Sequence, residues 1–174
     1  MGVSSSSPKY SSLIMEIAEQ KQLGTETVQV IYQKFCSISN NKDKIPVEDF
    51  SQFFEFSSKQ IFENLIKYIR IKDNVYFCDF VEMYLCLLPN VSNDKLSNLI
   101  YHSFLIKNEF SYEVFINELR FSGILTDKNE EVKLTEMFKA FNEDEPINNL
   151  LKESKIGNVS LLDLGRQLIF SKFI

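Results

Sequence analysis

The chain has 174 residues, with 19 Lys and Arg against 24 Asp and Glu, which gives a formal net charge of −5. That sign disfavours nucleic-acid binding, which depends on cationic contacts with phosphates. No apolar run approaches the roughly 18 residues of a membrane-spanning helix, and the N-terminus lacks the apolar segment of a secretory signal. We therefore expect a cytoplasmic protein.

Catalytic and zinc-binding patterns are missing from the sequence. There are three Cys residues without C-x-x-C spacing, a single His, and no glycine-rich phosphate loop. His102 is expected to be a packed or surface residue of a helix rather than a ligand. We therefore predict that the protein is not an enzyme.

Hydrophobic periodicity divides the chain into an N-terminal arm and two helical halves. The small polar residues 1–9 predict a flexible arm, and the polar residues 89–95 predict a linker between lobes at 10–88 and 96–174. Helices are predicted at 10–22, 28–35, 46–56, 61–69, 77–88, 96–105, 112–119, 131–141 and 159–174, with an extra turn through residue 151.

A fourfold pattern recurs along these helices. Each repeat has a turn, then one β-like apolar residue, then an apolar residue five positions later that lies in the following helix. The β-like residues are Ile45, Val75, Phe110 and Val159. Two positions earlier stand Asp43, Asp73, Asn108 and Gly157, which are residue types that tolerate a left-handed backbone. The alternative is a generic helical bundle whose turns coincide by chance.

The repeat resembles the EF-hand, and the order of its parts resembles calcineurin B and the calcineurin B homologous proteins. The segments that carry the likeness are 30–35, 48–50 and 74–77, together with the N-terminal Met1-Gly2. The resemblance implies an all-α fold of two lobes, each a pair of EF-hand-like helix-loop-helix units joined by a short inter-loop β-bridge.

The loops themselves do not match the chemistry of calcium binding. Calcium takes six to eight oxygen ligands, several of them anionic, yet no loop places two carboxylates at ligand positions. Three loops place a lysine (Lys42, Lys72 or Lys107) at the fifth position, where its charge repels a divalent cation. We therefore expect no cofactor and no metal. The weak metal candidates are Asn40, Asp43, Asp49 and Asp163, which leave a shifted or weak calcium site as the alternative.

The lysines suggest a replacement for the ion. Lys42 and Lys72 are placed to pair with Asp49 and Asp79, which would hold the first two loops without metal. The alternative is that these lysines are solvated on surface turns, because exposed ion pairs contribute only about 0–1 kcal/mol.

Sixteen Phe residues are more than two small lobes obviously need, and apolar surface left exposed requires a partner. An EF-hand lobe offers an apolar groove for one face of an amphipathic helix. The groove candidates are Phe53, Phe54, Phe56, Phe62, Leu65, Ile69, Tyr84, Leu88, Phe104, Phe115, Leu119, Phe138, Phe141 and Leu168. Alternatively, the apolar tail 167–174 folds back and fills its own groove.

The first six residues, Met1 to Ser6, fit the N-myristoylation pattern, so Gly2 is a candidate lipidation site. One acyl chain anchors a protein only marginally, so we expect weak or no membrane contact and a location that is cytoplasmic or at most peripheral to a membrane. The alternative is an unmodified arm.

These observations predict a non-catalytic adaptor or regulatory subunit that binds an amphipathic helix of a larger protein. The resemblance implies that the partner is a phosphatase, a kinase or the tail of an ion transporter. Two alternatives remain open at this point: a calcium sensor with one atypical functional hand, and a permanent structural subunit of a large assembly.

Overall fold

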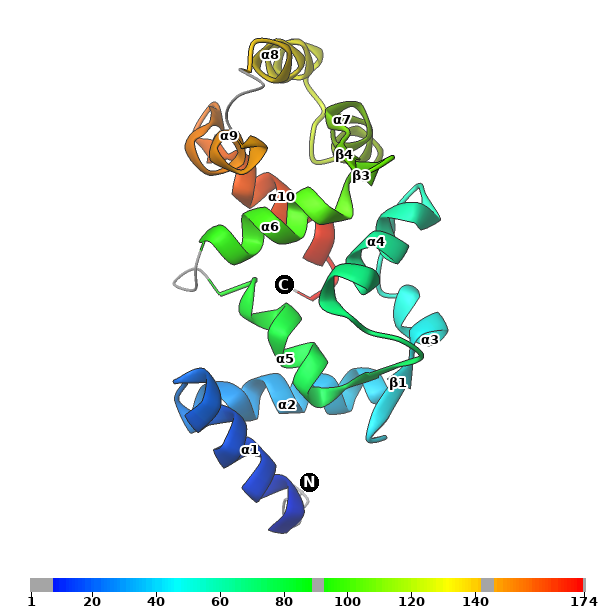
Figure 1. The fold of residues 1–174 in the computed structure, drawn as a ribbon, viewed down its shortest axis with the longest axis vertical. Helices are drawn as coiled ribbons and strands as arrows, with labels where there is room; N and C mark the ends of the chain where they lie inside the picture. The colour runs from blue at the N-terminus through cyan, green and yellow to red at the C-terminus, as the bar shows by residue number, and fades with distance from the viewer. Residues whose placement is uncertain (1–7, 89–92, 142–145, 174) are drawn as a thin grey trace.

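Residues 8–88, 93–141 and 146–173 are described by a computed structural model, in which the chain is mostly helical, as predicted (Figure 1). The first half contains α1 (Pro8–Lys21), α2 (Thr25–Ser39), β1 (Lys44–Pro46), α3 (Val47–Ser51), α4 (Lys59–Ile69), β2 (Asn74–Tyr76) and α5 (Phe77–Leu85). The second half contains α6 (Asn93–Ser103), β3 (Leu105–Ile106), β4 (Glu109–Phe110), α7 (Tyr112–Phe121), α8 (Lys128–Lys139), α9 (Ile147–Glu153), β5 (Lys155–Ile156), β6 (Val159–Ser160) and α10 (Leu161–Phe170).

The predicted arm and linker are shorter in the structure than in the sequence interpretation. Helix α1 begins at Pro8, inside the predicted arm, and α6 begins at Asn93, inside the predicted linker. The remaining residues of both segments, with the lipidation candidate Gly2, lie outside the described residues.

Strands β1 and β2 join the first two loops. They pair antiparallel, with Ile45 opposite Val75, and both side chains are buried. These are the two β-like apolar residues that the repeat singled out. Their pairing places α3 and α5, which begin directly after the strands, at the two ends of one short ladder.

The second half departs from this arrangement. Strand β3 pairs with β4 and β5 with β6, so each printed strand pair is a hairpin inside its own loop. Lys107 and Asn108 both have positive φ, as a type I′ turn requires, while Gly157 supplies positive φ at the first position of the other turn. The predicted inter-loop bridge is therefore wrong for these strands, because two-residue turns close each ladder locally.

Positive φ angles occur at two of the four predicted turn residues. Asn108 and Gly157 adopt the left-handed conformation, but Asp43 and Asp73 do not. In the first two loops the left-handed residues instead cap the preceding helices, Asn40 at the end of α2 and Arg70 at the end of α4. Helix α2 therefore runs past its predicted end at residue 35, whereas α4 ends at Ile69 as predicted. In both loops the left-handed residue comes earlier than the repeat predicts.

Side-chain caps begin several of the helices. The Asp79 carboxylate accepts a hydrogen bond from the backbone N–H of Tyr76 at 2.9 Å, which caps α5. At the start of α10 the Ser160 hydroxyl accepts from the backbone N–H of Asp163 at 3.1 Å. Such caps satisfy backbone donors that have no partner within the helix.

Helix α9 occupies the place where the sequence predicted only an extra turn. It directly precedes β5 and packs against α6 and α10, with Leu151 fully buried, whereas α8 packs mainly against α7. The segment through residue 151 is therefore part of the helical core rather than an extra turn at its edge.

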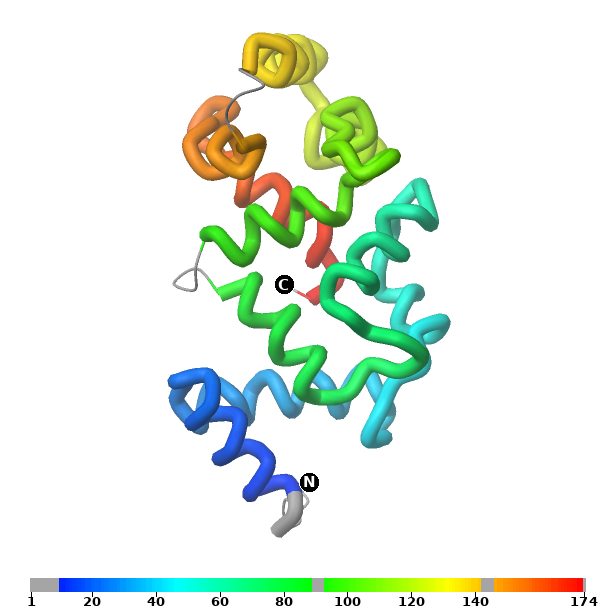
Figure 2. The backbone as a smooth tube through the Cα atoms, in the orientation of Figure 1, coloured from blue at the N-terminus to red at the C-terminus, as the bar shows by residue number. Residues whose placement is uncertain are grey.

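One hydrophobic cluster contains buried residues from both halves. Helix α6 contacts α4 of the first half as well as α9 and α10 of its own half, and the backbone trace shows α6 beside α4 (Figure 2). Burial of the apolar faces of α4 and α6 against each other is thus the largest helix-to-helix contact between the halves.

Polar contacts add to this packing. The buried Glu118 carboxylate on α7 accepts from the backbone N–H of Ser57 at 3.1 Å and from the Ser57 hydroxyl. The Asn64 amide of α4 donates to the carbonyls of Ser103 at 3.1 Å and Leu105 at 2.9 Å. A buried carboxylate is tolerated only when hydrogen-bonded, so Glu118 depends on the connection between α3 and α4.

We predict that Gly165→Ala destabilises the fold at the contact between α10 and α6. A Cβ at this position would overlap the Ile100 side chain, with Cγ1 at 2.9 Å and Cδ1 closer still. Overpacking of this kind costs about 1–3 kcal/mol, which urea unfolding would measure.

Ile100→Val removes the closer atom and supplies the control. In a double-mutant cycle, Ile100→Val should cost less in the Gly165→Ala chain than in the native chain. Strictly additive effects would contradict the overlap.

Candidate functional site

The C-terminal end of the chain inserts an aromatic ring into the first half. Phe173 is only 5% exposed, and its ring centroid lies 5.4 Å from that of Phe54, 6.0 Å from Phe80, 6.1 Å from Phe53 and 6.2 Å from Phe50. We call the space bounded by these four rings the Phe173 slot. Burying one such side chain contributes about 1.5–3 kcal/mol.

Two lysines fix the tail around this ring. The Lys34 ammonium donates to the Phe173 carbonyl at 3.0 Å and lies 5.5 Å from the centroid of the Tyr84 ring. The Lys172 ammonium pairs with Glu55 at 2.9 Å. Because both side chains of this second pair are largely exposed, it contributes little, and the ring is the main anchor.

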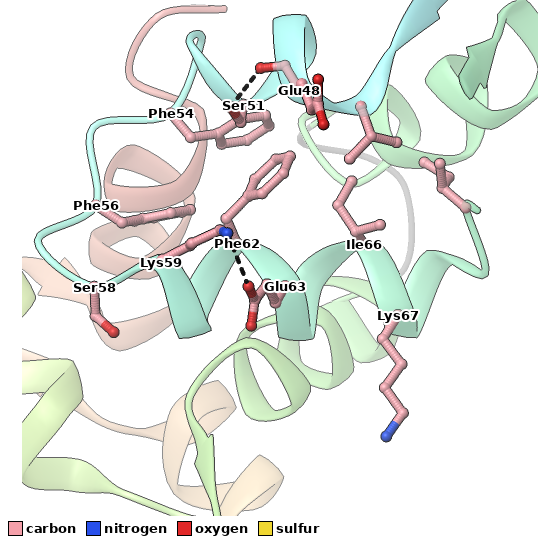
Figure 3. A pocket seen from close by; sticks show the side chains of 12 residues that line it. Glu48, Ser51, Phe54, Phe56, Ser58, Lys59, Phe62, Glu63, Ile66 and Lys67 are labelled. Atoms are coloured by element: carbon pink, nitrogen blue, oxygen red, sulfur yellow. Dashed lines mark hydrogen bonds and ion pairs between the residues drawn. The ribbon is translucent and has the colours of Figure 1, made fainter. Parts of the chain in front are cut away.

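A cavity of about 660 Å³ lies beside the slot, between α3 and α4 (Figure 3). Phe54, Phe62 and Ile66 point into it, and Phe56 closes one end. Phe54 lines both spaces, since its ring also stacks on Phe56 at 5.7 Å and meets Phe62 at 5.3 Å. The cavity and the slot are therefore neighbours with one shared wall.

Charged side chains surround the cavity. Glu48 lies on the α3 side, while Lys59, Glu63 and Lys67 follow each other along α4. Lys59 and Glu63 form an exposed ion pair at 3.6 Å. The mouth of the cavity therefore carries both signs of charge around an apolar interior.

The predicted groove residues separate into three groups. The first group lies at the two spaces: the slot is lined by Phe53 and Phe54, and the cavity is lined by Phe54, Phe56 and Phe62. Tyr84 belongs to this group because it packs on Phe80, a slot residue. Residues that are buried in the core are Leu65, Phe104, Phe115, Leu119, Phe138 and Leu168. Partly exposed residues outside both spaces are Ile69, Leu88 and Phe141. Apart from Phe141, the candidates of the second half thus supply core rather than a surface.

The groove prediction left out residues of both spaces. Phe50 and Phe80 were read as repeat markers rather than slot residues, and Val47 and Ile71 complete the cavity. A signal for the slot was present in the apolar tail, whose folding back was weighed as an alternative and is the arrangement that Phe173 adopts.

The four metal candidates have other roles or lie apart. Asp43 accepts a hydrogen bond from the Tyr10 hydroxyl, and Asn40 caps α2. Asp163 accepts from the Ser160 hydroxyl at 2.8 Å and pairs with Arg166, and Asp49 lies in the first turn of α3. Across the described ranges, no group of three or more His, Cys, Asp or Glu side chains is arranged to hold a metal ion.

The proposed lysine replacements are not formed. The ion pairs of the described residues do not join Lys42 to Asp49 or Lys72 to Asp79. Asp79 instead caps α5, so the lysines behave as the solvated alternative predicted.

Two of the thiols, Cys78 and Cys86, are not activated as nucleophiles. Burial raises the pKa of Cys86 to about 11 and also raises that of Cys78. Both thiols are therefore protonated at neutral pH, whereas a nucleophilic cysteine needs a lowered pKa.

In the part of the chain that the structure describes, no helix has the length and apolar character needed to cross a bilayer. Comparisons with protein-family models, with curated proteins and with solved structures find no significant match to this chain. The likeness to the EF-hand therefore stays a prediction from the sequence.

We predict that His102 makes stability depend on pH. Its ring stacks on Tyr68 of α4 at 4.4 Å, and burial lowers its pKa below the ordinary value of 6.5. The unfolded chain therefore binds the proton more readily, so this contribution is present above pH 6.5 and is lost as pH falls through the lowered pKa.

The measurement is urea unfolding of the native chain and of His102→Phe between about pH 7 and about pH 5. The native chain should lose more stability over this range than the variant. An NMR titration midpoint of His102 above its ordinary value would contradict the prediction.

Proposed function

We propose that the chain is a non-catalytic adaptor or regulatory subunit that binds an amphipathic helix of a larger protein through the Phe173 slot. The observation that supports this is the occupant of the slot. An aromatic side chain from a distant part of the chain already fills a site bounded by four Phe rings, in the manner of a helix-in-groove anchor.

The tail is an occupant that a partner can replace. Leu168, Ile169 and Phe170 of α10 are buried in the core. Beyond the Phe173 ring, the described residues after α10 are held by a backbone hydrogen bond from Phe173 to Phe170, one hydrogen bond from Lys34 and exposed contacts of Lys172. A tethered segment competes at an effective concentration in the millimolar range. A partner helix that buries several apolar residues can bind with micromolar affinity, and it can then displace the tethered tail.

The EF-hand-like part of the proposal rests mainly on the first half. The ladder with Ile45 opposite Val75 joins two helix-loop-helix units as paired hands are joined, while hairpins replace the bridge in the second half. By the resemblance, we propose a phosphatase, a kinase or an ion-transporter tail as the class of partner. We also propose a cytoplasmic location, with at most weak membrane contact through an acyl chain on Gly2.

Calcium has no role in this proposal. The Asp163 carboxylate caps and pairs within its own helix, and Lys107 lies in a tight hairpin turn. Both arrangements oppose a cage of oxygen ligands.

We predict that a peptide of residues 166–173 binds in trans to Phe173→Ala at least about tenfold more tightly than to the native chain. The substitution empties the slot, whereas the native tail occupies it. Fluorescence anisotropy of the labelled peptide gives both dissociation constants.

Phe121→Ala is the matched control, because it makes the same change at a side chain that is 64% exposed and lies outside the slot. It should bind the peptide as weakly as the native chain does. A peptide ending in Ala in place of its last Phe should bind neither variant. Equal weak binding by all three proteins would rule out the slot as a docking site.

We also predict that the thermal unfolding midpoint is the same, within error, in EDTA and in excess calcium. A ligand stabilises the state that binds it, so a loop that binds calcium must raise the midpoint. A rise of several degrees would favour the alternative of a calcium sensor with one atypical functional hand.

A further inference from the structure

The cavity between α3 and α4 is a separate space from the slot that the tail fills. Phe54 forms the wall between them. Phe173 contacts the face of the cluster made by Phe50, Phe53 and Phe80, and no ring contact joins it to Phe56 or Phe62 among the described residues. The cavity therefore remains open while the tail is in place.

Its volume and walls fit one or two large apolar side chains. About 660 Å³ lies within the range of small-ligand sites, and its deepest walls are Phe62, Ile66 and Ile71, each less than a tenth exposed. Figure 3 shows Phe62 and Ile66 of α4 facing α3 across the empty space, whereas Lys67 extends away from it.

The charges at the mouth define the occupant more closely. Within the described ranges, Glu48 on the α3 wall belongs to no ion pair. On the α4 wall, Lys59 has an exposed ion pair with Glu63 at 3.6 Å. An anionic lipid headgroup would meet Glu48 and Glu63 at the mouth and a chain of net charge −5. A peptide with basic and acidic residues beside its apolar face can place an opposite charge against each wall.

The neighbouring slot supplies a template for this kind of ligand. There the occupant is an aromatic residue preceded by a lysine, and that lysine pairs with Glu55 on the connection between α3 and α4. Glu48, on α3, offers the cavity a similar carboxylate.

We propose that the α3–α4 cavity is a second peptide-binding subsite, which takes a large apolar side chain from a partner helix. That helix carries a basic residue toward Glu48 and an acidic residue toward Lys59. The subsite deepens the proposed function and rests on it, because the same partner would fill the cavity and replace Phe173 on the other side of Phe54.

Three helical probe peptides of about 15 residues test this subsite. They share one apolar face bearing Phe, and their flanks are all basic, all acidic, or basic on one side and acidic on the other. The native chain should bind the mixed probe about threefold more tightly than either other probe. Glu48→Lys makes both walls basic and should move the preference to the acidic probe.

Ser51→Trp fills the cavity and should weaken binding of the mixed probe about tenfold, while Phe173→Ala should not weaken it. Lys133→Glu, an exposed lysine of α8, is the control for a change in net charge and should leave the order of the probes unchanged. Unchanged melting temperatures would show that the variants remain folded.

Three results would overturn the subsite. They are equal binding by the native chain and Ser51→Trp, preference for the basic probe in every variant, and tight binding of palmitate without any preference among the probes. If the tail peptide still binds Phe173→Ala in these cases, the proposed function stands and only the cavity assignment fails. If the tail peptide binds no variant while Ser51→Trp blocks the mixed probe, the slot fails instead.

Discussion

The insertion of the Phe173 ring between the helices of the first half is the contact on which the proposed docking site depends. It joins the end of the chain to rings that lie on α3, α5 and the segment after α3. Loop-closure entropy grows only slowly with chain length, so a contact over this separation costs little more than a shorter one. Its burial therefore contributes stability while leaving a side chain that a competitor can mimic.

The rest of the fold positions this contact. Helix α10 carries the tail, and α10 is held by α6, which also packs on α4. The close approach at Gly165 allows α10 to lie against Ile100. The hydrogen bonds of Glu118 to Ser57 then hold the connection between α3 and α4, which supplies Phe54 and Phe56 to the two spaces. The proposed docking surface in the first half thus depends on elements of both halves.

Helical periodicity predicted most of the helices, because apolar residues at helical spacing are strongly constrained by burial. The residues Ile45 and Val75 were also predicted correctly as β-like positions. Loop geometry was less predictable. The sequence placed the left-handed residues at Asp43 and Asp73, but the helix caps at Asn40 and Arg70 determine where the chain turns. A hairpin with a two-residue turn and a bridge to another loop show the same short apolar pattern in the sequence. The pattern therefore does not distinguish them, and the hairpins of the second half were missed.

The candidate site was predictable only in part, for a related reason. Spacing along a helix identifies an apolar face, but it does not show whether another helix covers that face. Phe104 and Phe115 therefore looked like groove residues and are core, while Phe54 and Phe62 line open space. The occupant of the slot was one of two alternatives for the tail, and only the three-dimensional arrangement of Phe173 distinguishes them.

The central claim is that the Phe173 slot is a docking site whose resident is the chain's own tail. Fluorine NMR of a chain with para-fluorophenylalanine at position 173 tests it most directly. The account predicts one resonance typical of a buried ring, which moves to the position of a solvent-exposed ring when a saturating amphipathic helix is added. A resonance that stays at the buried position while the helix is bound would contradict the account.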